Sequence, residues 1–377
     1  MTALAPILIA AGGTGGHMFP ALALARSLLD RGEPVTVITD KRGARYLPDD
    51  IDRRIIRAGS PTGSLGARLG GILALAYGTL QTFGLMGRLA PRAVACFGGY
   101  ASVPAGVAAR LTGCPLLLHE QNAVFGRANR LLARFSRTIA LSFERTTRVP
   151  DGPAVIVTGN PVRPGFRLDA AAFRAPGPTE PFRLLVIGGS QGARILSDVV
   201  PEAVAQLPEL LRRRLRIQQQ CRPEDLTRVC ERYAADGIDA EVTAFFKDMP
   251  TQLAQAHLLV SRAGASSLTE IMAMGRPAIL VPYAAAADDH QRANADVLAA
   301  AGGAVRILQA EFDAASLLAA LEMLMLDPVR LTGMAAVARA HYQDDAARRL
   351  ADAVLAMIPD GGRVGRRAPA AGPEAVR

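Results

Sequence analysis

A chain of 377 residues, half of them apolar, is long enough for two domains or for one large domain with a sizeable core. Its net charge of +9 indicates anionic partners, such as phosphates or an anionic membrane surface. Aromatic residues make up only 5% of the chain, which offers few stacking platforms and argues against binding to nucleic acid.

The cysteines and the first residues bear on the cellular compartment. Cys96, Cys114, Cys221 and Cys230 are widely spaced and form no Cys-x-x-Cys pair, so neither a zinc site nor a disulfide framework is predicted. No basic segment precedes the first apolar run, so we expect no signal peptide. Together these features predict a cytosolic protein with reduced thiols.

Short apolar runs alternate with helical patterns along most of the chain. Alternating strands and helices predict βαβ units and parallel sheets, and continuous apolar runs suit strands that are covered on both faces. The predicted strands are Pro6–Ile9, Pro34–Thr39, Ala93–Phe97, Pro115–Leu118, Thr138–Leu141, Ala154–Thr158, Phe182–Ile187, Leu215–Gln219, Ala240–Ala244, His257–Val260, Ala278–Val281 and Ala304–Ile307.

The two halves of the chain repeat one layout. Each opens with an apolar strand, a glycine turn and a helix, at Ile7–Leu24 and at Leu184–Leu196, and the proline-rich stretch Gly159–Pro181 separates them. We therefore expect an α/β protein with two Rossmann-like, doubly wound domains facing a cleft. Ligands of such sheets lie beyond the carboxyl ends of the strands.

The first glycine loop lies in Ala10–Pro20, between a strand and a helix, and it contains His17. Bare backbone at a helix N-terminus lets N–H groups approach an anion. The loop departs from the dinucleotide fingerprint because Met18 stands where the third glycine would fall. Asp40, at the end of the second strand, keeps a nicotinamide cofactor open as an alternative. His17 is either a catalytic base or a histidine that caps or packs at the helix start.

Two further loops in the second half could hold a phosphate. Gly188–Arg194 is a glycine turn in which Ser190 offers a hydroxyl, although an ordinary βα turn would look similar. Ser261–Glu270 places small residues at a helix start, which again leaves backbone N–H groups free for an anion. Glu270 suits two ribose hydroxyls as a bidentate acceptor, or it is simply an acid favoured by the helix dipole.

Polar clusters follow other predicted strands. His119–Asn122 comes directly after a buried strand, where polar groups are costly unless they are satisfied or functional. Asp288–Asn294 suits the reading of sugar hydroxyls better than a metal site, because its spacing does not match a metal-ligand pattern. Arg163, at the domain junction, either reaches a ligand that bridges both halves or pins the linker.

The segment Leu69–Gly87 has no charge over 19 residues and is flanked by Arg68 and Arg88. It is nearly long enough to span a bilayer, but it contains five glycines and three polar residues. A buried helix and a membrane-surface patch are the two main alternatives, and a true span is the third. As a patch, it would present Leu69, Ile72, Leu73, Leu75 and Tyr77.

Taken together, these motifs resemble glycosyltransferase family 28, and the resemblance runs from about Ile7 to Ile358. It is carried by the order and spacing of Gly12–His17 (GGTGGH), Gly98–Tyr100 (GGY), His119–Asn122 (HEQN), Gly159–Arg163 (GNPVR), Gly188–Arg194 (GGSQGAR), Ser261–Glu270 (SRAGASSLTE) and the DDHQRANA stretch that starts at Asp288.

The resemblance implies the GT-B fold and an inverting transfer of N-acetylglucosamine. The donor would be UDP-GlcNAc, and the acceptor would be the 4-hydroxyl of MurNAc in lipid I, which becomes lipid II in peptidoglycan synthesis. The implied domains are 1–160 for the acceptor and membrane, and 161–342 for the donor. A helix at 343–358 would pack back on the first domain, and 359–377 would be a disordered tail. Hinge closure is expected at Gly159–Arg163.

The resemblance also assigns roles to matching positions. Glu270 would hold the ribose, Phe245 with the Phe246 backbone would hold uracil, and Ser190 with the turn Ala265–Ser267 would hold the diphosphate. His17 becomes the leading general base, with His119 and Glu120 as second choices. The implied substrate-binding residues are Thr14, Gly15, Gly16, Asn122, Arg163, Ser190, Phe245, Phe246, Ala265, Ser266, Ser267, Leu268, Thr269, Glu270 and Gln291.

No metal or other cofactor is implied, because helix N-termini aimed at the leaving UDP would stabilise its charge. The implied location is peripheral, on the cytoplasmic face of the bacterial inner membrane. The resemblance also implies other cell-wall synthesis proteins as partners. Two other functions fit the same architecture: a UDP-GlcNAc 2-epimerase, which needs no lipid, and a non-catalytic subunit that binds a nucleotide or lipid.

Overall fold

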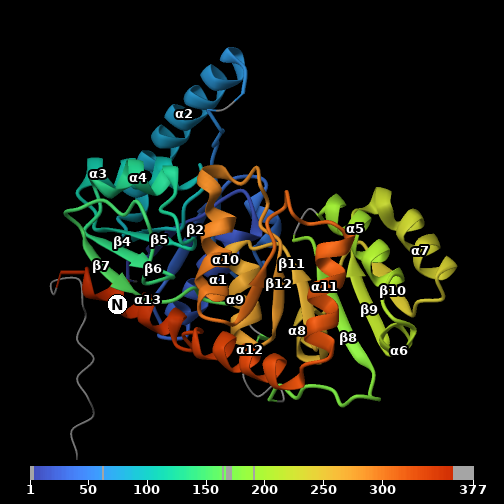
Figure 1. Cartoon of the computed structure of the whole chain (residues 1–377). Coiled ribbons are helices and arrows are strands. Elements are labelled where there is room, and N and C mark those ends of the chain that lie inside the picture. The colour runs from blue at the N-terminus through green and yellow to red at the C-terminus, as the bar shows by residue number, and fades with distance from the viewer. Residues whose placement is uncertain (1–3, 62, 164, 167–171, 190–191, 360–377) are drawn as a thin grey trace, which may run out of the picture.

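The computed structural model describes residues 4–61, 63–163, 165–166, 172–189 and 192–359. Within these residues the chain forms two α/β units that lie side by side, each around a parallel sheet (Figure 1). Ser190 lies outside the described residues, and so does the predicted tail except for Pro359.

The first unit contains a seven-stranded sheet in the order β3-β2-β1-β4-β5-β6-β7, with all neighbours parallel. Its strands are β1 (Ile7–Ala10), β2 (Val35–Thr39), β3 (Arg53–Ile55), β4 (Ala93–Cys96), β5 (Leu116–Glu120), β6 (Thr138–Leu141) and β7 (Ala154–Val157). Its helices are α1 (Gly15–Leu29), α2 (Leu65–Leu89), α3 (Ser102–Thr112) and α4 (Arg127–Ala133), with a short 3₁₀ turn η1 (Gly43–Tyr46).

The second unit contains a six-stranded parallel sheet in the order β10-β9-β8-β11-β12-β13. Its strands are β8 (Phe182–Ile187), β9 (Leu215–Gln220), β10 (Ala240–Thr243), β11 (Leu258–Ser261), β12 (Ala278–Leu280) and β13 (Ala304–Arg306). Its helices are α5 (Arg194–Ala205), α6 (Glu209–Arg212), α7 (Leu226–Ala235), α8 (Met249–Gln255), α9 (Ala265–Ala273), α10 (His290–Ala300), α11 (Ala314–Met325) and α12 (Pro328–Ala340), with 3₁₀ turns η2 (Pro223–Asp225) and η3 (Ala287–Asp289).

Both faces of each sheet are covered, which explains the continuous apolar runs. In β1, Ile7 and Ile9 belong to one hydrophobic cluster, whereas Leu8 and Ala10 belong to another on the opposite face. Strand β8 divides its side chains between two clusters in the same way. The last helix, α13 (Ala346–Ala356), returns to the first unit, where it packs against α1 (Figure 1).

The observed elements differ from the predicted ones in a few places. Strand β3 was not predicted, because it is a three-residue edge strand with two arginines and no apolar run. Several predicted strands run one residue too far, so that Phe97, Thr158, Val281 and Ile307 follow the strands instead. These differences lie at strand ends and at a sheet edge, where pairing rather than hydrophobicity sets the boundary.

Helix α2 contains the charge-free segment and projects beyond the rest of the first unit (Figure 1). The prediction of a buried helix is wrong, because Leu69, Ile72, Leu73 and Tyr77 are all at least half exposed, and only Leu75 of the patch is partly covered. The buried positions of the helix are Gly71, Gly78, Thr82 and Met86. The side that faces the protein is therefore poor in large apolar residues, which leaves the apolar stripe uncovered.

Two glycines let the segment before α2 lie directly against the helix backbone. A Cβ atom at Gly78 would come within 2.1 Å of the Arg57 carbonyl oxygen, and one at Gly71 within 2.4 Å of the Ser60 carbonyl oxygen. Both contacts are with backbone, which cannot move aside as a flexible side chain can. The position of α2 therefore depends on these two glycines.

We expect Gly78→Ala to destabilise the protein by about 1–3 kcal/mol, because the added methyl overpacks the contact with Arg57. Gly84→Ala is the matched control on the same helix, since a Cβ there meets nothing within 4 Å. That control should stabilise the helix by up to about 1 kcal/mol. Thermal denaturation checks both variants, and equal shifts in Tm would contradict the packing described for α2.

Candidate active site

The first glycine loop is anchored by Asp40. Its Oδ1 atom accepts hydrogen bonds from the backbone N–H groups of Gly13, at 3.1 Å, and Gly43, at 2.8 Å. Burial by itself would raise the pKa of this carboxyl, but these hydrogen bonds and the neighbouring Arg42 outweigh it and lower the pKa. Asp40 therefore uses Oδ1 to hold the loop in shape and Oδ2 to pair with Arg42, which leaves no oxygen for a ribose and argues against the nicotinamide alternative.

His17 lies in the first turn of α1, half-buried at the carboxyl end of the first sheet. The turn Gly98–Gly99, which follows β4, packs against its ring, and a Cβ atom at either glycine would come within 3.3 Å of the imidazole. Both glycines have positive φ, which larger residues rarely adopt. The Nδ1 atom of His17 is 3.0 Å from Oε1 of Gln121, which leaves Nε2 for other contacts.

His119 and Glu120, the second choices for the base, are buried and fully engaged. The ring of His119 contacts Gly159 through Nε2 and Gln121 through Nδ1. The two carboxylate oxygens of Glu120 accept from Asn122, Gly126 and Asn129. Neither residue can take a proton from a substrate without losing these contacts, so the geometry favours His17.

Helices α1 and α9 approach each other with their N-termini at the junction of the two units. Ser266 Oγ, in the first turn of α9, donates to the Gly16 carbonyl oxygen at 3.5 Å. The N-cap residues Thr14 and Gly264 are extended, and neither makes a side-chain hydrogen bond to the start of its helix. Two uncapped helix N-termini offer free N–H donors and favourable dipoles to one anionic group.

Glu270 and Arg163 form a half-buried ion pair across this junction. The Nε and Nη2 atoms of Arg163 donate to the same oxygen of Glu270, at 3.1 and 2.9 Å. The guanidinium also stacks on Phe19 of α1, 4.3 Å from the ring centre, and lies near Phe166. Burial raises the pKa of Glu270, and Arg163 opposes part of that shift. Arg163 therefore joins the linker to α1 and α9.

The other predicted binding residues of the second unit lie after β10, in α9 and in α10. Phe245 follows β10 with an exposed ring, whereas Phe246 is buried beside it. In α9, Leu268 and Thr269 are buried, and Thr269 accepts a hydrogen bond from Asn160 of the linker. Gln291 of α10 accepts from the Tyr283 N–H at 3.0 Å.

The polar cluster Asp288–Asn294, which follows β12, joins the two units. Its polar composition alone did not predict this role. Asn294 is fully buried, accepts from the Ala123 N–H at 2.8 Å, and donates to Asn122 at 3.1 Å. Asp288 accepts from three arginines of the first unit, which are Arg127, Arg130 and Arg148. These contacts hold the units together beside α4.

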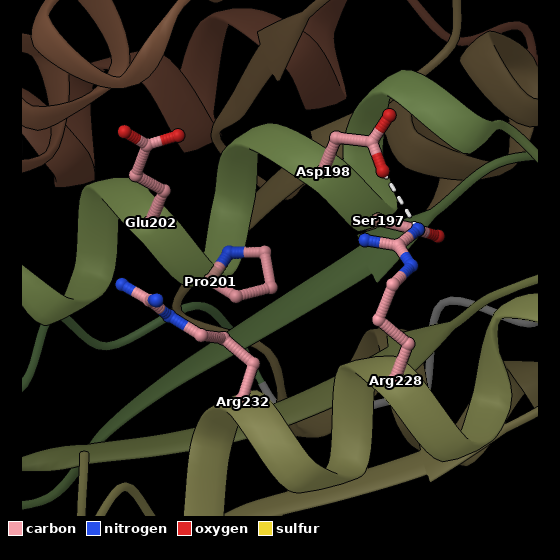
Figure 2. A pocket seen from close by; sticks show the side chains of 6 residues that line it. All are labelled: Ser197, Asp198, Pro201, Glu202, Arg228 and Arg232. Atoms are coloured by element: carbon pink, nitrogen blue, oxygen red, sulfur yellow. Dashed lines mark ion pairs between the residues drawn. The ribbon is translucent and has the colours of Figure 1, made fainter. Parts of the chain in front are cut away.

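A separate groove lies between α5 and α7, on the outer side of the second unit (Figures 1 and 2). Figure 2 shows that its side chains are mainly charged, and Asp198 pairs with Arg228 at 2.7 Å. Both partners of this ion pair are substantially exposed. The groove contains none of the predicted site residues, so we place the site at the junction of α1 and α9.

Comparisons with known proteins agree with this architecture. Models of the glycosyltransferase family 28 N-terminal and C-terminal domains match residues 7–141 and 183–350. A protein of Paramagnetospirillum magneticum is 51% identical over 364 residues, which are 94% of this chain and 97% of that protein. It is named UDP-N-acetylglucosamine--N-acetylmuramyl-(pentapeptide) pyrophosphoryl-undecaprenol N-acetylglucosamine transferase. A protein of Rhodospirillum centenum with the same name is 49% identical and covers 93% of this chain and 94% of its own length.

Among solved structures, the crystal structure of Acinetobacter baumannii MurG matches with a TM-score of 0.76 and 32% identity. The match covers 93% of this chain and 99% of that chain, and it confirms the expected GT-B arrangement of two parallel-sheet domains. Because the match to the Paramagnetospirillum protein spans nearly the whole length at 51% identity, the chain belongs to glycosyltransferase family 28.

Proposed function

We propose that this enzyme transfers N-acetylglucosamine from UDP-GlcNAc to the 4-hydroxyl of MurNAc in lipid I, which forms lipid II for peptidoglycan synthesis. The family and the names of its relatives give the class of reaction. The observation that carries the proposal is the meeting of two uncapped helix N-termini at the domain junction, with His17 in the first turn of one of them.

The donor would bind mainly to the second domain. The N–H groups of Ala265, Ser266 and Ser267 would hold the diphosphate, together with Ser190 of the second glycine loop, Gly188–Arg194. Glu270 would accept from the ribose hydroxyls, and since Arg163 uses only one of its oxygens, the other remains for the sugar. The exposed ring of Phe245 offers uracil a stacking surface beside the Phe246 backbone, and Gln291 would complete the donor sugar's site.

The acceptor would lie against Thr14–Gly16 and Asn122 of the first domain. Its 4-hydroxyl oxygen attacks the anomeric carbon, and the bond from that carbon to the UDP oxygen breaks with inversion. Nε2 of His17 takes the hydroxyl proton, while UDP leaves with the electron pair. The N-termini of α1 and α9 stabilise the charge that develops on the leaving diphosphate.

Acceptor-dependent release of UDP tests this function against its two alternatives. The enzyme should release UDP from UDP-GlcNAc only when a short-chain lipid I analogue is present. A 2-epimerase would convert UDP-GlcNAc without an acceptor, which NMR of the nucleotide sugar detects, and a binding subunit would show neither reaction. Either of those results would contradict the proposed transfer.

Because lipid I is lipid-linked, the enzyme is membrane-associated, and we assign its contact to the exposed stripe of α2. The stripe carries Leu69, Ile72, Leu73 and Tyr77, and the guanidinium of Arg57 lies 5.3 Å from the Tyr77 ring centre. No Asp or Glu occurs between Asp52 and Glu120, so the surroundings are basic. An apolar stripe with basic flanks suits a peripheral position on the anionic cytoplasmic face of the membrane.

By length and composition alone, α2 could also cross a bilayer. Part of the helix packs against α3, however, and the segment before it lies on Gly71 and Gly78. A spanning position would have to break these contacts, so a surface position accounts for the structure better.

We expect Leu73→Glu to lower partitioning onto anionic vesicles by roughly tenfold or more, because an apolar side chain is replaced by a charge that the membrane repels. Leu210→Glu is the control, since Leu210 is also exposed but lies on α6 of the second domain. Vesicle flotation measures both variants. Unchanged binding of Leu73→Glu would contradict membrane contact through α2.

A further inference from the structure

The side chains of His119 and Gln121 link the interdomain segment to His17 through one continuous set of hydrogen bonds. His119 Nε2 lies 3.2 Å from the Gly159 carbonyl oxygen, and His119 Nδ1 lies 2.9 Å from Gln121 Nε2. Gln121 Oε1 lies 3.0 Å from His17 Nδ1. His119 and Gln121 are almost completely buried, so water does not compete for these contacts. Gln121 was not among the predicted site residues.

The chemistry of the atoms sets the direction of each hydrogen bond. The Gly159 carbonyl can only accept, so His119 must donate from Nε2. Burial lowers the pKa of His119 to about 4, which keeps its ring neutral and leaves Nδ1 as an acceptor. Gln121 therefore donates its amide N–H to His119 Nδ1.

A second contact fixes the same orientation of the Gln121 amide. Nε2 of Gln121 also donates to the His119 carbonyl oxygen at 3.2 Å. A flipped amide would place its oxygen against that carbonyl and against the lone pair of His119 Nδ1, and both contacts would be repulsive. The amide oxygen of Gln121 therefore faces His17, and the Nδ1 atom of His17 must donate to it.

We propose that Gln121, oriented by His119 and the Gly159 carbonyl, is a positioning residue that holds His17 in the tautomer protonated at Nδ1. The lone pair of His17 then resides on Nε2, where it can accept the proton of the attacking hydroxyl. Neutral imidazole in water favours the opposite tautomer, so a base at this position needs such a partner. The inference rests on the proposed function only for the source of that proton.

The test reads the tautomer of His17 directly. In enzyme labelled with ¹⁵N-histidine, imidazole nitrogen shifts distinguish protonated from unprotonated nitrogens, and the spectrum of His17→Gln assigns the His17 signals. We expect Nδ1 of His17 to be protonated and Nε2 to be unprotonated in the wild-type enzyme. Protonation at Nε2 instead would overturn the proposal, and that result does not depend on any variant folding.

Two variants of Gln121 separate orientation from packing. Gln121→Met keeps the volume but cannot hydrogen-bond, so His17 should shift toward the Nε2-protonated form, and kcat should fall roughly tenfold with the donor KM unchanged. Gln121→Glu can reproduce both hydrogen bonds when its buried carboxyl is protonated, because the protonated oxygen donates to His119 Nδ1 while the other oxygen accepts from His17 Nδ1. In that form the variant should keep the Nδ1-protonated tautomer of His17. Protonation of His17 at Nε2 there, or an unchanged tautomer in Gln121→Met, would contradict the positioning role.

The spectra and the transfer assay can fail independently. Absence of acceptor-dependent transfer in the wild-type enzyme would overturn the proposed function, while the tautomer shift in Gln121→Met would still establish the hydrogen-bonded chain. Transfer with the wrong wild-type tautomer would overturn the chain and leave the proposed function intact.

Discussion

Replacement of His17 by alanine is expected to lower kcat by about 10²–10⁴-fold, the usual contribution of a general base. The donor KM should stay unchanged, because in the proposed site the base touches the acceptor hydroxyl, whereas the nucleotide is held by α9 and the glycine loop. Steady-state kinetics with UDP-GlcNAc and a lipid I analogue separate the two parameters.

A second histidine supplies the control for this experiment. His341 is the exposed residue directly after α12, and its ring contacts the Val337 carbonyl of that helix, so His341→Ala should leave kcat unchanged. An unchanged kcat in His17→Ala would dismiss His17 as the base. A rise in donor KM with kcat preserved would instead assign His17 to nucleotide binding.

Glu270→Ala is expected to weaken UDP binding by roughly 10–150-fold, which corresponds to about 1.5–3 kcal/mol for hydrogen bonds to a charged group. The physical reason is the loss of the carboxylate that would accept from the ribose hydroxyls. The change also leaves Arg163 without its ionic partner, so thermal denaturation must accompany the binding measurement by calorimetry.

Glu180→Ala is the matched control, because Glu180 also pairs with an arginine, Arg174, but on the exposed surface of the second domain. UDP affinity should be unaffected there. If Glu270→Ala binds UDP as tightly as the wild-type enzyme does, the ribose assignment is wrong and the Arg163–Glu270 pair serves only to join the domains.

Much of the fold could be predicted because buried parallel strands are apolar on both faces. Strand β1 is a clear case, since its alternate residues enter two different cores. The sequence could not decide the environment of α2 in the same way. The apolar composition of the helix suits a buried and an exposed position equally. The side that packs against the protein is set by Gly71 and Gly78, because the absence of a side chain there lets the preceding backbone segment lie on the helix.

Most residues of the candidate site could be predicted from the sequence, but their contacts could not. Glycine loops and polar residues after strands were visible in the sequence, because the carboxyl ends of parallel strands share one edge of a sheet. The partners of those residues were not visible. Gln121 contacts His17 from 104 positions away within the first domain, and Asn294 contacts Asn122 from 172 positions away across the two domains, so only the folded structure reveals these roles.

The central claim is an inverting transfer of N-acetylglucosamine to a lipid-linked acceptor. NMR of the product formed from ¹³C-labelled UDP-GlcNAc and a lipid I analogue tests it most directly. The account predicts a new glycosidic bond at the MurNAc 4-hydroxyl, with the β configuration that inversion of the α-linked donor gives. An α linkage, a bond to another hydroxyl, or conversion of the donor without transfer would contradict it.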